Sequence, residues 1–278
     1  MSAASGAYRG RTLVMGVLNV TANSFSDGGR WLEHADALAH GLELVAQGAD
    51  IVDVGGESTR PDSERVAEDV ELSRVVPVVA ELAARGVEVS VDTTRASVAA
   101  ASLDAGATWI NDVSGGLADP AMLGVVAERD GGYVSMHWRG HATEMGANAV
   151  YDDVLAEVLA ELAQRRDEAL ASGIAPDKLV LDPGFGFAKT GEHNWTLLKH
   201  LDAFDALGYP LLIGVSRKRF LGTLLADGGE PRPAVERDDA TLAVTTWVAE
   251  RGAWAVRTHT VRPHRDAVAV VERLRREP

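Results

Sequence analysis

The sequence predicts a (β/α)8 barrel, an α/β fold formed by a single domain. Eight short apolar runs occur along the 278 residues, helix-like segments separate them, and each run ends at a polar residue. Such alternation most simply closes into a barrel of eight parallel strands. Barrels of this class carry their chemistry at the carboxyl ends of the strands, where these polar residues lie. The runs are residues 13–18, 51–54, 87–91, 108–110, 133–136, 179–181, 211–215 and 253–256.

The first half of the chain supplies four strand–helix units. Residues 1–11, rich in Ser, Ala and Gly, are expected to form a flexible lead-in, and residues 12–278 the barrel domain. The first strand leads into a polar loop, 21–30, and the second into a loop, 55–66, in which Gly and Pro disfavour regular structure. Helices are expected at residues 33–47, 68–85, 95–105 and 120–129.

The second half repeats the unit with longer connections. A polar stretch, 139–148, follows the fifth strand, and apolar residues at helical spacing then predict a long amphipathic helix at 152–172. Residues 227–233 contain two Gly and two Pro, which predicts a surface loop after the seventh strand. Helices at 234–250 and 261–275 complete the barrel.

Composition narrows the possible functions. The net charge of −14 argues against a general nucleic-acid or anionic-membrane binder. The absence of cysteine excludes disulfides, thiolate metal sites and a cysteine nucleophile. Because the amino end shows no signal-like apolar stretch and no run approaches the ~20 residues of a membrane span, we expect a soluble, cytoplasmic protein.

Three polar side chains follow the third, fourth and sixth strands. Asp92, Asn111 and Asp182 would face one barrel mouth, where carboxylates and an amide can hydrogen-bond a heterocycle that carries donors and acceptors. Each alone could equally cap a helix N-terminus, but three on one rim favour a binding site. The stretch 182–187 (DPGFGF) strengthens this interpretation, because its glycines let the backbone approach a ligand.

Basic residues follow the seventh strand. Lys218 lies near the start of a predicted helix, a position that suits an anion or an electron-rich ring atom. For Arg217 and Arg219 a solvated basic face is an equal alternative. His137 is expected to be a satisfied, semi-buried histidine. The residues Trp138, Trp195, Trp247 and Trp254 are expected to pack rather than to stack on a ligand.

The first and last strands adjoin when a barrel closes, and they carry further candidates. Arg257 and His259 together could clamp a phosphate, while Asn19 could ligate a hard cation through its oxygen. Asp27 could supply a second oxygen ligand, although residues 27–29 also form an ordinary turn sequence.

Taken together, these stretches resemble dihydropteroate synthase over essentially the whole barrel. Any one motif is weak, but their ordered succession makes the resemblance specific. The motifs are residues 15–21 (MGVLNVT), 24–29 (SFSDGG), 53–61 (DVGGESTRP), 91–93 (VDT), 111–116 (NDVSGG), 136–139 (MHWR), 182–187 (DPGFGF), 216–222 (SRKRFLG) and 257–259 (RTH).

The resemblance implies a step of folate biosynthesis. In it, (7,8-dihydropterin-6-yl)methyl diphosphate and 4-aminobenzoate give 7,8-dihydropteroate and diphosphate, and sulfonamides mimic 4-aminobenzoate. It also implies a homodimer. The family pattern assigns the pterin to Asp92, Asn111, Asp182 and Lys218, and the pyrophosphate and Mg2+ to Asn19, Arg257 and His259, with Asp27 on the metal side. It further places Thr59 near the pyrophosphate, Phe25 and Pro61 in the aminobenzoate pocket, and Arg219 near the aminobenzoate carboxylate.

The chain departs from the family pattern at three places. Ala22 and Asn23 replace a Pro-Asp pair, Asp62 replaces a Gly, and Thr260 replaces an Asp after the histidine of the clamp. These changes motivate one alternative, a catalytically weakened pterin-binding paralogue that acts as a binding or regulatory partner. Two others are a methyltetrahydrofolate-dependent methyl transferase and a different phosphate-handling barrel.

Overall fold

The computed structural model describes residues 10–20, 30–57, 65–141 and 146–276, so most of the predicted lead-in lies outside it. Among these residues, eight parallel strands form one sheet in the order β6-β5-β4-β3-β2-β1-β8-β7. An isolated parallel bridge between Leu181 and Leu211 joins the two ends of the sheet. The predicted single-domain (β/α)8 barrel is therefore confirmed. The strands are β1 (Leu13–Asn19), β2 (Ile51–Gly55), β3 (Val89–Asp92), β4 (Trp109–Asp112), β5 (Gly132–Met136), β6 (Leu179–Asp182), β7 (Leu212–Ile213) and β8 (Ala255–Thr258).

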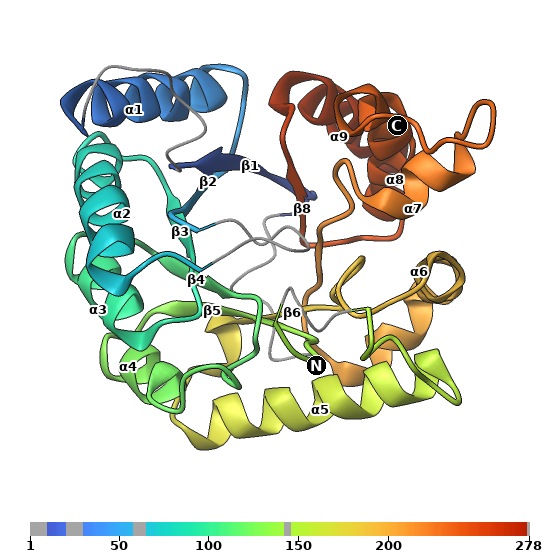
Figure 1. The fold of residues 1–278 in the computed structure, drawn as a ribbon, viewed down its shortest axis with the longest axis horizontal. Coiled ribbons are helices and arrows are strands. Elements are labelled where there is room, and N and C mark those ends of the chain that lie inside the picture. The colour runs from blue at the N-terminus through green and yellow to red at the C-terminus, as the bar shows by residue number, and fades with distance from the viewer. Residues whose placement is uncertain (1–9, 21–29, 58–64, 142–145, 277–278) are drawn as a thin grey trace.

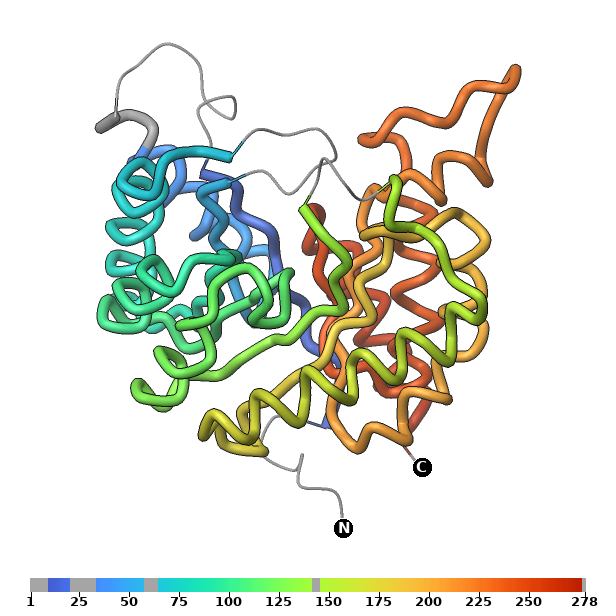
Figure 2. The backbone as a smooth tube through the Cα atoms, turned by 60° about the horizontal axis from the view of Figure 1, so that its bottom comes forward, coloured from blue at the N-terminus to red at the C-terminus, as the bar shows by residue number. Residues whose placement is uncertain are grey.

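The helices surround the strands, as Figure 1 shows. The helix predicted at 234–250 divides into a 3-10 turn, η4 (Ala234–Arg237), and α8 (Asp238–Glu250). The loop predicted after the seventh strand is exposed, and segment 225–233 (orange) projects from the barrel in Figure 2. The other α-helices in the described ranges are α1 (Arg30–Ala46), α2 (Glu68–Ala83), α3 (Ala96–Asp104), α4 (Met122–Glu128), α5 (Val154–Ala171), α6 (Gly191–Lys199), α7 (Arg219–Leu224) and α9 (Val261–Arg275), and the other 3-10 turns are η2 (Pro176–Lys178) and η3 (Leu201–Leu207).

Four strand predictions need correction. The fourth strand was predicted over 108–110 and the eighth over 253–256, but their ladders are Trp109–Asp112 and Ala255–Thr258. The seventh strand was predicted over 211–215, but only Leu212–Ile213 form its ladder, because Leu211 bridges β6 instead. The third was predicted over 87–91, but pairing begins at Val89 and extends through Asp92. The polar residues at the ends of β1, β3 and β6 are therefore the last paired residues of their strands, which fixes their backbone positions.

Alternation along each strand divides the core into two parts. Outward-facing residues such as Val14, Val52 and Val91 pack against the helices. Inward-facing residues form a separate apolar cluster inside the barrel, and the rings of Trp109 and Trp254 lie within it with centroids 5.0 Å apart. None of the described helices is long and apolar enough to cross a membrane. The inner cluster fills the barrel below its carboxyl end.

Candidate active site

A polar layer lies directly above the inner apolar cluster. Inward-facing positions recur every second residue along a strand, so each member follows an apolar cluster residue by two. All four side chains therefore converge at the carboxyl end of the barrel. They are Asp53 after Ile51, Asn111 after Trp109, Asp182 after Val180 and Arg257 after Ala255.

Arg257 is held by two carboxylates across the barrel. Its Nε donates to Asp53 Oδ2 at 2.6 Å, and its Nη2 donates to Asp92 Oδ2 at 2.8 Å. Asn111 Nδ2 also donates to Asp53 Oδ2, at 3.1 Å. Asp53 is fully buried, and its Oδ1 has no hydrogen-bond partner among the described residues. Arg257, predicted for a phosphate clamp, thus lies between Asp92 and Asp53.

Burial controls the charge of this layer. Burial raises the pKa of Asp92, which binds Arg257 of this layer, to about 7; the nearby carboxyls of Asp53, Glu71 and Asp112 act in the same direction, and Arg257 opposes them. For Arg257, burial acts to lower the pKa, but the two carboxylates outweigh it and raise that pKa. Asp92 is therefore poised to change charge near neutral pH, whereas Arg257 stays cationic.

Lys218 and Asp182 lie on the other side of the mouth. Asp182 Oδ1 accepts a hydrogen bond from the Gly184 amide at 2.7 Å. Lys218 Nζ donates to the Phe185 carbonyl and lies 4.4 Å from the centroid of the Phe187 ring. Burial lowers the pKa of Lys218 to about 8 and raises that of Asp182, and each of the two opposes the shift of the other. Lys218 and Asp182 can therefore offer a hydrogen-bond donor and a carboxyl group to the same ligand.

Two glycines of the loop after β6 are required by close contacts. Gly184 has φ 70° and Gly186 has φ 77°. A Cβ at Gly184 would lie 2.4 Å from the His137 carbonyl oxygen, and one at Gly186 would lie 2.7 Å from Lys218 Cδ. Glycine at both positions lets the loop fit between β5 and Lys218.

The remaining described candidates lie around the same mouth. His259 Nδ1 is 2.8 Å from Ser216 Oγ, which joins β8 to the end of β7. Arg219 is exposed at the first position of α7. Arg217 instead binds Asp238 through Nε and Nη2, both at 2.8 Å, and is part of the packing. The candidates Phe25, Asp27, Thr59 and Pro61, with the departures at Ala22, Asn23 and Asp62, lie outside the described residues.

Asn19 occupies the mouth beside Asp92. Asn19 Oδ1 and Asp92 Oδ2 both lie 3.9 Å from the position that a Cβ on Gly55 would take. Gly55 thus leaves space next to Asn19 Oδ1, and an amide oxygen is a suitable ligand for a hard cation. No group of three or more His, Cys, Asp or Glu side chains that could hold a metal occurs in the described ranges.

Predictions about histidine and tryptophan are also tested. His137 is buried, with Nε2 2.9 Å from Glu161 Oε2 and Nδ1 2.9 Å from Lys189 Nζ, so a satisfied histidine is confirmed. Trp254 is buried in the inner cluster. Trp195 and Trp247 pack against the outer core, and the Trp138 ring contacts His141 edge-on.

Sequence reasoning missed Asp53 and Lys189. Asp53 lies inside an apolar run, where two-residue periodicity with Ile51 could have indicated an inward position. Lys189 follows the glycine motif, and no sequence signal shows that its amine turns inward. The structure reveals Asp53 through its bonds to Asn111 and Arg257, and Lys189 through its bonds to His137 and to the carbonyls of Gly184 and Phe187.

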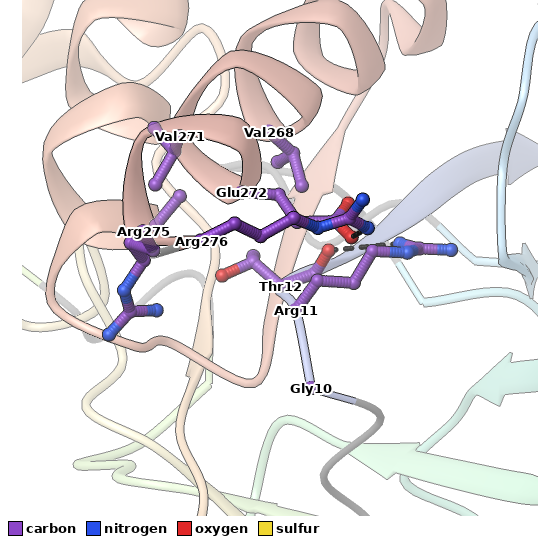
Figure 3. A pocket seen from close by; sticks show the side chains of 9 residues that line it. Gly10, Arg11, Thr12, Val268, Val271, Glu272, Arg275 and Arg276 are labelled. Atoms are coloured by element: carbon purple, nitrogen blue, oxygen red, sulfur yellow. Dashed lines mark hydrogen bonds and ion pairs between the residues drawn. The ribbon is translucent and has the colours of Figure 1, made fainter. Parts of the chain in front are cut away.

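A cavity of about 230 Å³ lies elsewhere, between the start of β1 and α9 (Figure 3). Arg11, on its wall, is bound by both carboxylate oxygens of Asp50, and Glu272 is bound by Arg276. These charges are already paired, and the cavity is separate from the polar layer. It is not the candidate site.

Comparison with known proteins agrees with this geometry. The family described as pterin binding enzyme matches residues 15–259. The dihydropteroate synthase of Mycobacterium leprae (strain TN) is 57% identical over 260 residues, 93% of this chain and 92% of that protein. The structure of Xanthomonas albilineans dihydropteroate synthase with 4-aminobenzoic acid has a TM-score of 0.88 and 41% identity, covering 96% of this chain and 94% of that one.

A second solved structure extends the comparison. Yersinia pestis dihydropteroate synthase in a sulfonamide drug complex has a TM-score of 0.87 and 41% identity, covering 95% of this chain and 94% of that one. The family match spans most of the barrel, and the identity to the mycobacterial relative extends over nearly the whole chain. This chain therefore belongs to the pterin-binding enzymes and, among them, to the dihydropteroate synthases.

Proposed function

We propose that the barrel mouth condenses (7,8-dihydropterin-6-yl)methyl diphosphate with 4-aminobenzoate to give 7,8-dihydropteroate and diphosphate. One observation carries the proposal: Asp182, Asn111 and Lys218 converge with Asp92 above a closed apolar layer. Such a site offers donors and acceptors to a flat heterocycle and excludes deeper water. The relatives are named as synthases, which supports catalysis rather than a role as a binding or regulatory partner.

The proposed mechanism assigns a role to each charge. Asp92, Asn111 and Asp182 orient the pterin by hydrogen bonds, and Lys218 binds an electron-rich ring atom. Departure of pyrophosphate leaves a cationic methylene, which the carboxylates of Asp92 and Asp182 stabilise. Arg257 uses Nε and Nη2 on Asp53 and Asp92, so the pyrophosphate would meet its remaining nitrogen, Nη1.

The second substrate needs position rather than a strong base. The aniline nitrogen of 4-aminobenzoate is a weak nucleophile, but it attacks a cationic carbon readily, and the nitrogen then loses one proton to solvent to give the neutral product. Holding both reactants at the correct separation then supplies much of the acceleration. Arg219, exposed beside Lys218 at the start of α7, is our candidate for the aminobenzoate carboxylate, with Phe25, Thr59 and Pro61 proposed from the family pattern.

The test is an assay of purified protein with the pterin pyrophosphate, 4-aminobenzoate and Mg2+. Dihydropteroate that forms only when both substrates are present would support the synthase. Pterin binding without product would favour the weakened paralogue. Methyl transfer from methyltetrahydrofolate, or turnover of a phosphate ester that lacks a pterin, would favour the two other barrel functions.

Magnesium removal is expected to abolish most of the turnover. We propose that Asn19 binds Mg2+ through Oδ1 together with pyrophosphate oxygens, and that Asp27 adds to this site. Bound Mg2+ would absorb negative charge that develops on the leaving group. Product formation is measured with EDTA and after Mg2+ is added back. Asn19→Ala should raise the Mg2+ concentration required for half-maximal rate, and undiminished activity in EDTA would contradict the metal site.

The pH dependence of kcat/KM for the pterin substrate should show a limb near neutrality. Asp92 is proposed to act as a carboxylate, and burial raises its pKa to about 7, so kcat/KM should rise as the pH increases through about 7. The effect of pH on the free energy of unfolding has the opposite sign. Because the pKa of Asp92 in the folded protein lies above its ordinary 3.8, Asp92 contributes to stability below about pH 4, and this contribution is lost as the pH rises through about 7. A pH–rate profile and urea unfolding over the same range test both. A flat profile between about pH 6 and 8 would contradict the assignment.

A homodimer is also proposed. Val270 and Leu274, four residues apart on α9, are 58% and 79% exposed, and Trp247 lies on the adjacent α8. Such apolar side chains are suited to burial against a second copy. Sedimentation velocity tests the dimer, and cell fractionation tests the predicted cytoplasmic location.

A further inference from the structure

Lys189 is a charged residue beside Asp182 that the mechanism above does not use. It follows the loop 183–188, which connects β6 to α6. Its Nζ lies 2.9 Å from His137 Nδ1 and donates to the carbonyl oxygens of Gly184 and Phe187, each at 3.1 Å. Three acceptors match the three N–H bonds of its ammonium form, and burial lowers the pKa of Lys189 to about 7. The contacts tie both ends of the glycine-containing loop to one side chain.

His137 anchors this ammonium to the barrel wall. His137 Nε2 lies 2.9 Å from Glu161 Oε2, and Glu161 is held in turn by Arg139. A carboxylate only accepts, so the network assigns the imidazole proton to Nε2 and leaves Nδ1 to accept from Lys189. Burial, assisted by Lys189, lowers the pKa of His137 to about 4, in agreement with a neutral ring. A chain of polar contacts thus runs from α5 through β5 to the loop.

Lys218 holds the same loop from the opposite side. It donates to the Phe185 carbonyl and lies over the Phe187 ring, while a Cβ on Gly186 would meet its side chain. Asp182 is coupled to the loop by the bond from the Gly184 amide. A displacement of the loop would therefore move the partners of both Lys218 and Asp182.

The backbone at the end of the loop adopts a conformation that surrounding contacts must hold in place. Ala188 has φ 44°, a left-handed conformation that is unfavourable for alanine. Its carbonyl accepts a hydrogen bond from Tyr151 Oη at 3.0 Å, and the next residue is Lys189. Strain of this kind persists only where surrounding contacts hold the chain. Tyr151 and Lys189 supply such contacts.

We propose that Lys189 is a positioning residue of this enzyme: by binding Gly184, Phe187 and His137 at once, it fixes the loop so that Lys218 and Asp182 face the pterin. The inference rests on the proposed function for the identity of the ligand. It predicts an effect of Lys189 on pterin affinity although Lys189 itself need not touch the substrate.

The experiment compares Lys189→Met and Lys189→Gln with wild type. Methionine has a similar length but no N–H, whereas glutamine keeps two donors without a charge. Lys178→Met is the matched control, because Lys178 lies at the amino end of β6 and binds Asp130 on the surface. Affinity for 6-hydroxymethylpterin is measured by fluorescence, and kcat and KM are measured for both substrates.

Lys189→Met is expected to weaken pterin binding and lower kcat/KM by about 10- to 100-fold, since a displacement near 1 Å can cost about 100-fold. Lys189→Gln should lose less, and Lys178→Met should match wild type. Loss of the positive charge should also raise the pKa of Asp182, which Lys218, Lys189 and Arg257 all lower. The part of the pH profile that reports Asp182 should therefore shift to higher pH in both Lys189 variants, while the limb near pH 7 assigned to Asp92 stays in place, a pattern that general loosening of the fold would not produce.

The outcomes separate the two proposals. If wild-type protein binds the pterin but forms no product, the proposed function is contradicted. The ratio of pterin affinities between wild type and each Lys189 variant then still tests the positioning role of Lys189. A folded Lys189→Met protein with pterin affinity and kcat/KM within about twofold of wild type overturns the inference. If the methionine variant does not fold, as shown by circular dichroism, Lys189→Gln decides by the same ratios and the same pH shift.

Discussion

Replacing Lys218 by alanine is expected to lower kcat/KM for the pterin substrate by about 10²- to 10³-fold, the usual loss when one preorganised charged or polar donor is removed from an active site. Lys218 is the only lysine that the proposed mechanism assigns to the substrate. Its removal deletes the cation near Asp182 and the contact with the Phe185 carbonyl. The pKa of Asp182 should rise further, so that less carboxylate is present at neutral pH.

The measurement is steady-state kinetics with both substrates and Mg2+. Asp182→Ala should give a comparable loss, because it removes the acceptor opposite Lys218. Lys199→Ala, at the exposed end of α6, is the control and should retain wild-type rates. A turnover rate indifferent to both Lys218→Ala and Asp182→Ala would show that the substrate binds elsewhere.

The largest expected effect on stability is that of Arg95→Met, about 3–5 kcal/mol, as found when one partner of a buried ion pair is removed. Arg95 Nη1 donates to Glu71, which is 1% exposed, and its Nη2 donates to the Val66 carbonyl at 2.6 Å. Without the arginine, Glu71 keeps only the hydroxyl bond from Thr93, at 2.7 Å, for a buried charge. We expect a lower urea midpoint with an unchanged slope.

A double variant isolates the cause. Arg95→Met combined with Glu71→Gln should recover much of the loss, because the second change removes the unpaired charge. Arg65→Met is the control: Arg65, like Arg95, donates to the Glu57 carboxylate, but Arg65 is 44% exposed, so its loss should cost no more than about 1 kcal/mol. Equal instability of the single and double variants would show that the arginine side chain matters for packing and not for charge.

Strand positions followed from the sequence because parallel strands in a barrel are buried on both faces. Continuous apolar runs such as 51–54 can therefore be recognised without knowledge of their neighbours. Strand ends were less predictable: in the seventh strand, a run of five apolar or small residues cannot show which of them join a ladder. That depends on where Leu211 meets Leu181 of β6.

Site residues divide in the same way. Asp92, Asn111 and Asp182 could be proposed as site residues because each directly follows a recognisable apolar run. Asp53 was missed inside its run, although its carboxylate holds Arg257 from 204 residues away.

Thr260, a departure from the family pattern, is the N-cap residue of α9 and makes no side-chain cap hydrogen bond.

The sequence by itself determined the barrel, the family and the rim proposed to carry the site, because these depend on periodicity, strand ends and ordered motifs. The tertiary structure decided which charges meet. Arg257, expected to clamp a phosphate, binds the carboxylates of Asp53 and Asp92, and the amine of Lys189 points toward His137 rather than toward solvent. These choices depend on side-chain directions and on distances across the closed barrel. Local sequence does not encode such distances, since they arise only when strands far apart in the chain are brought into register.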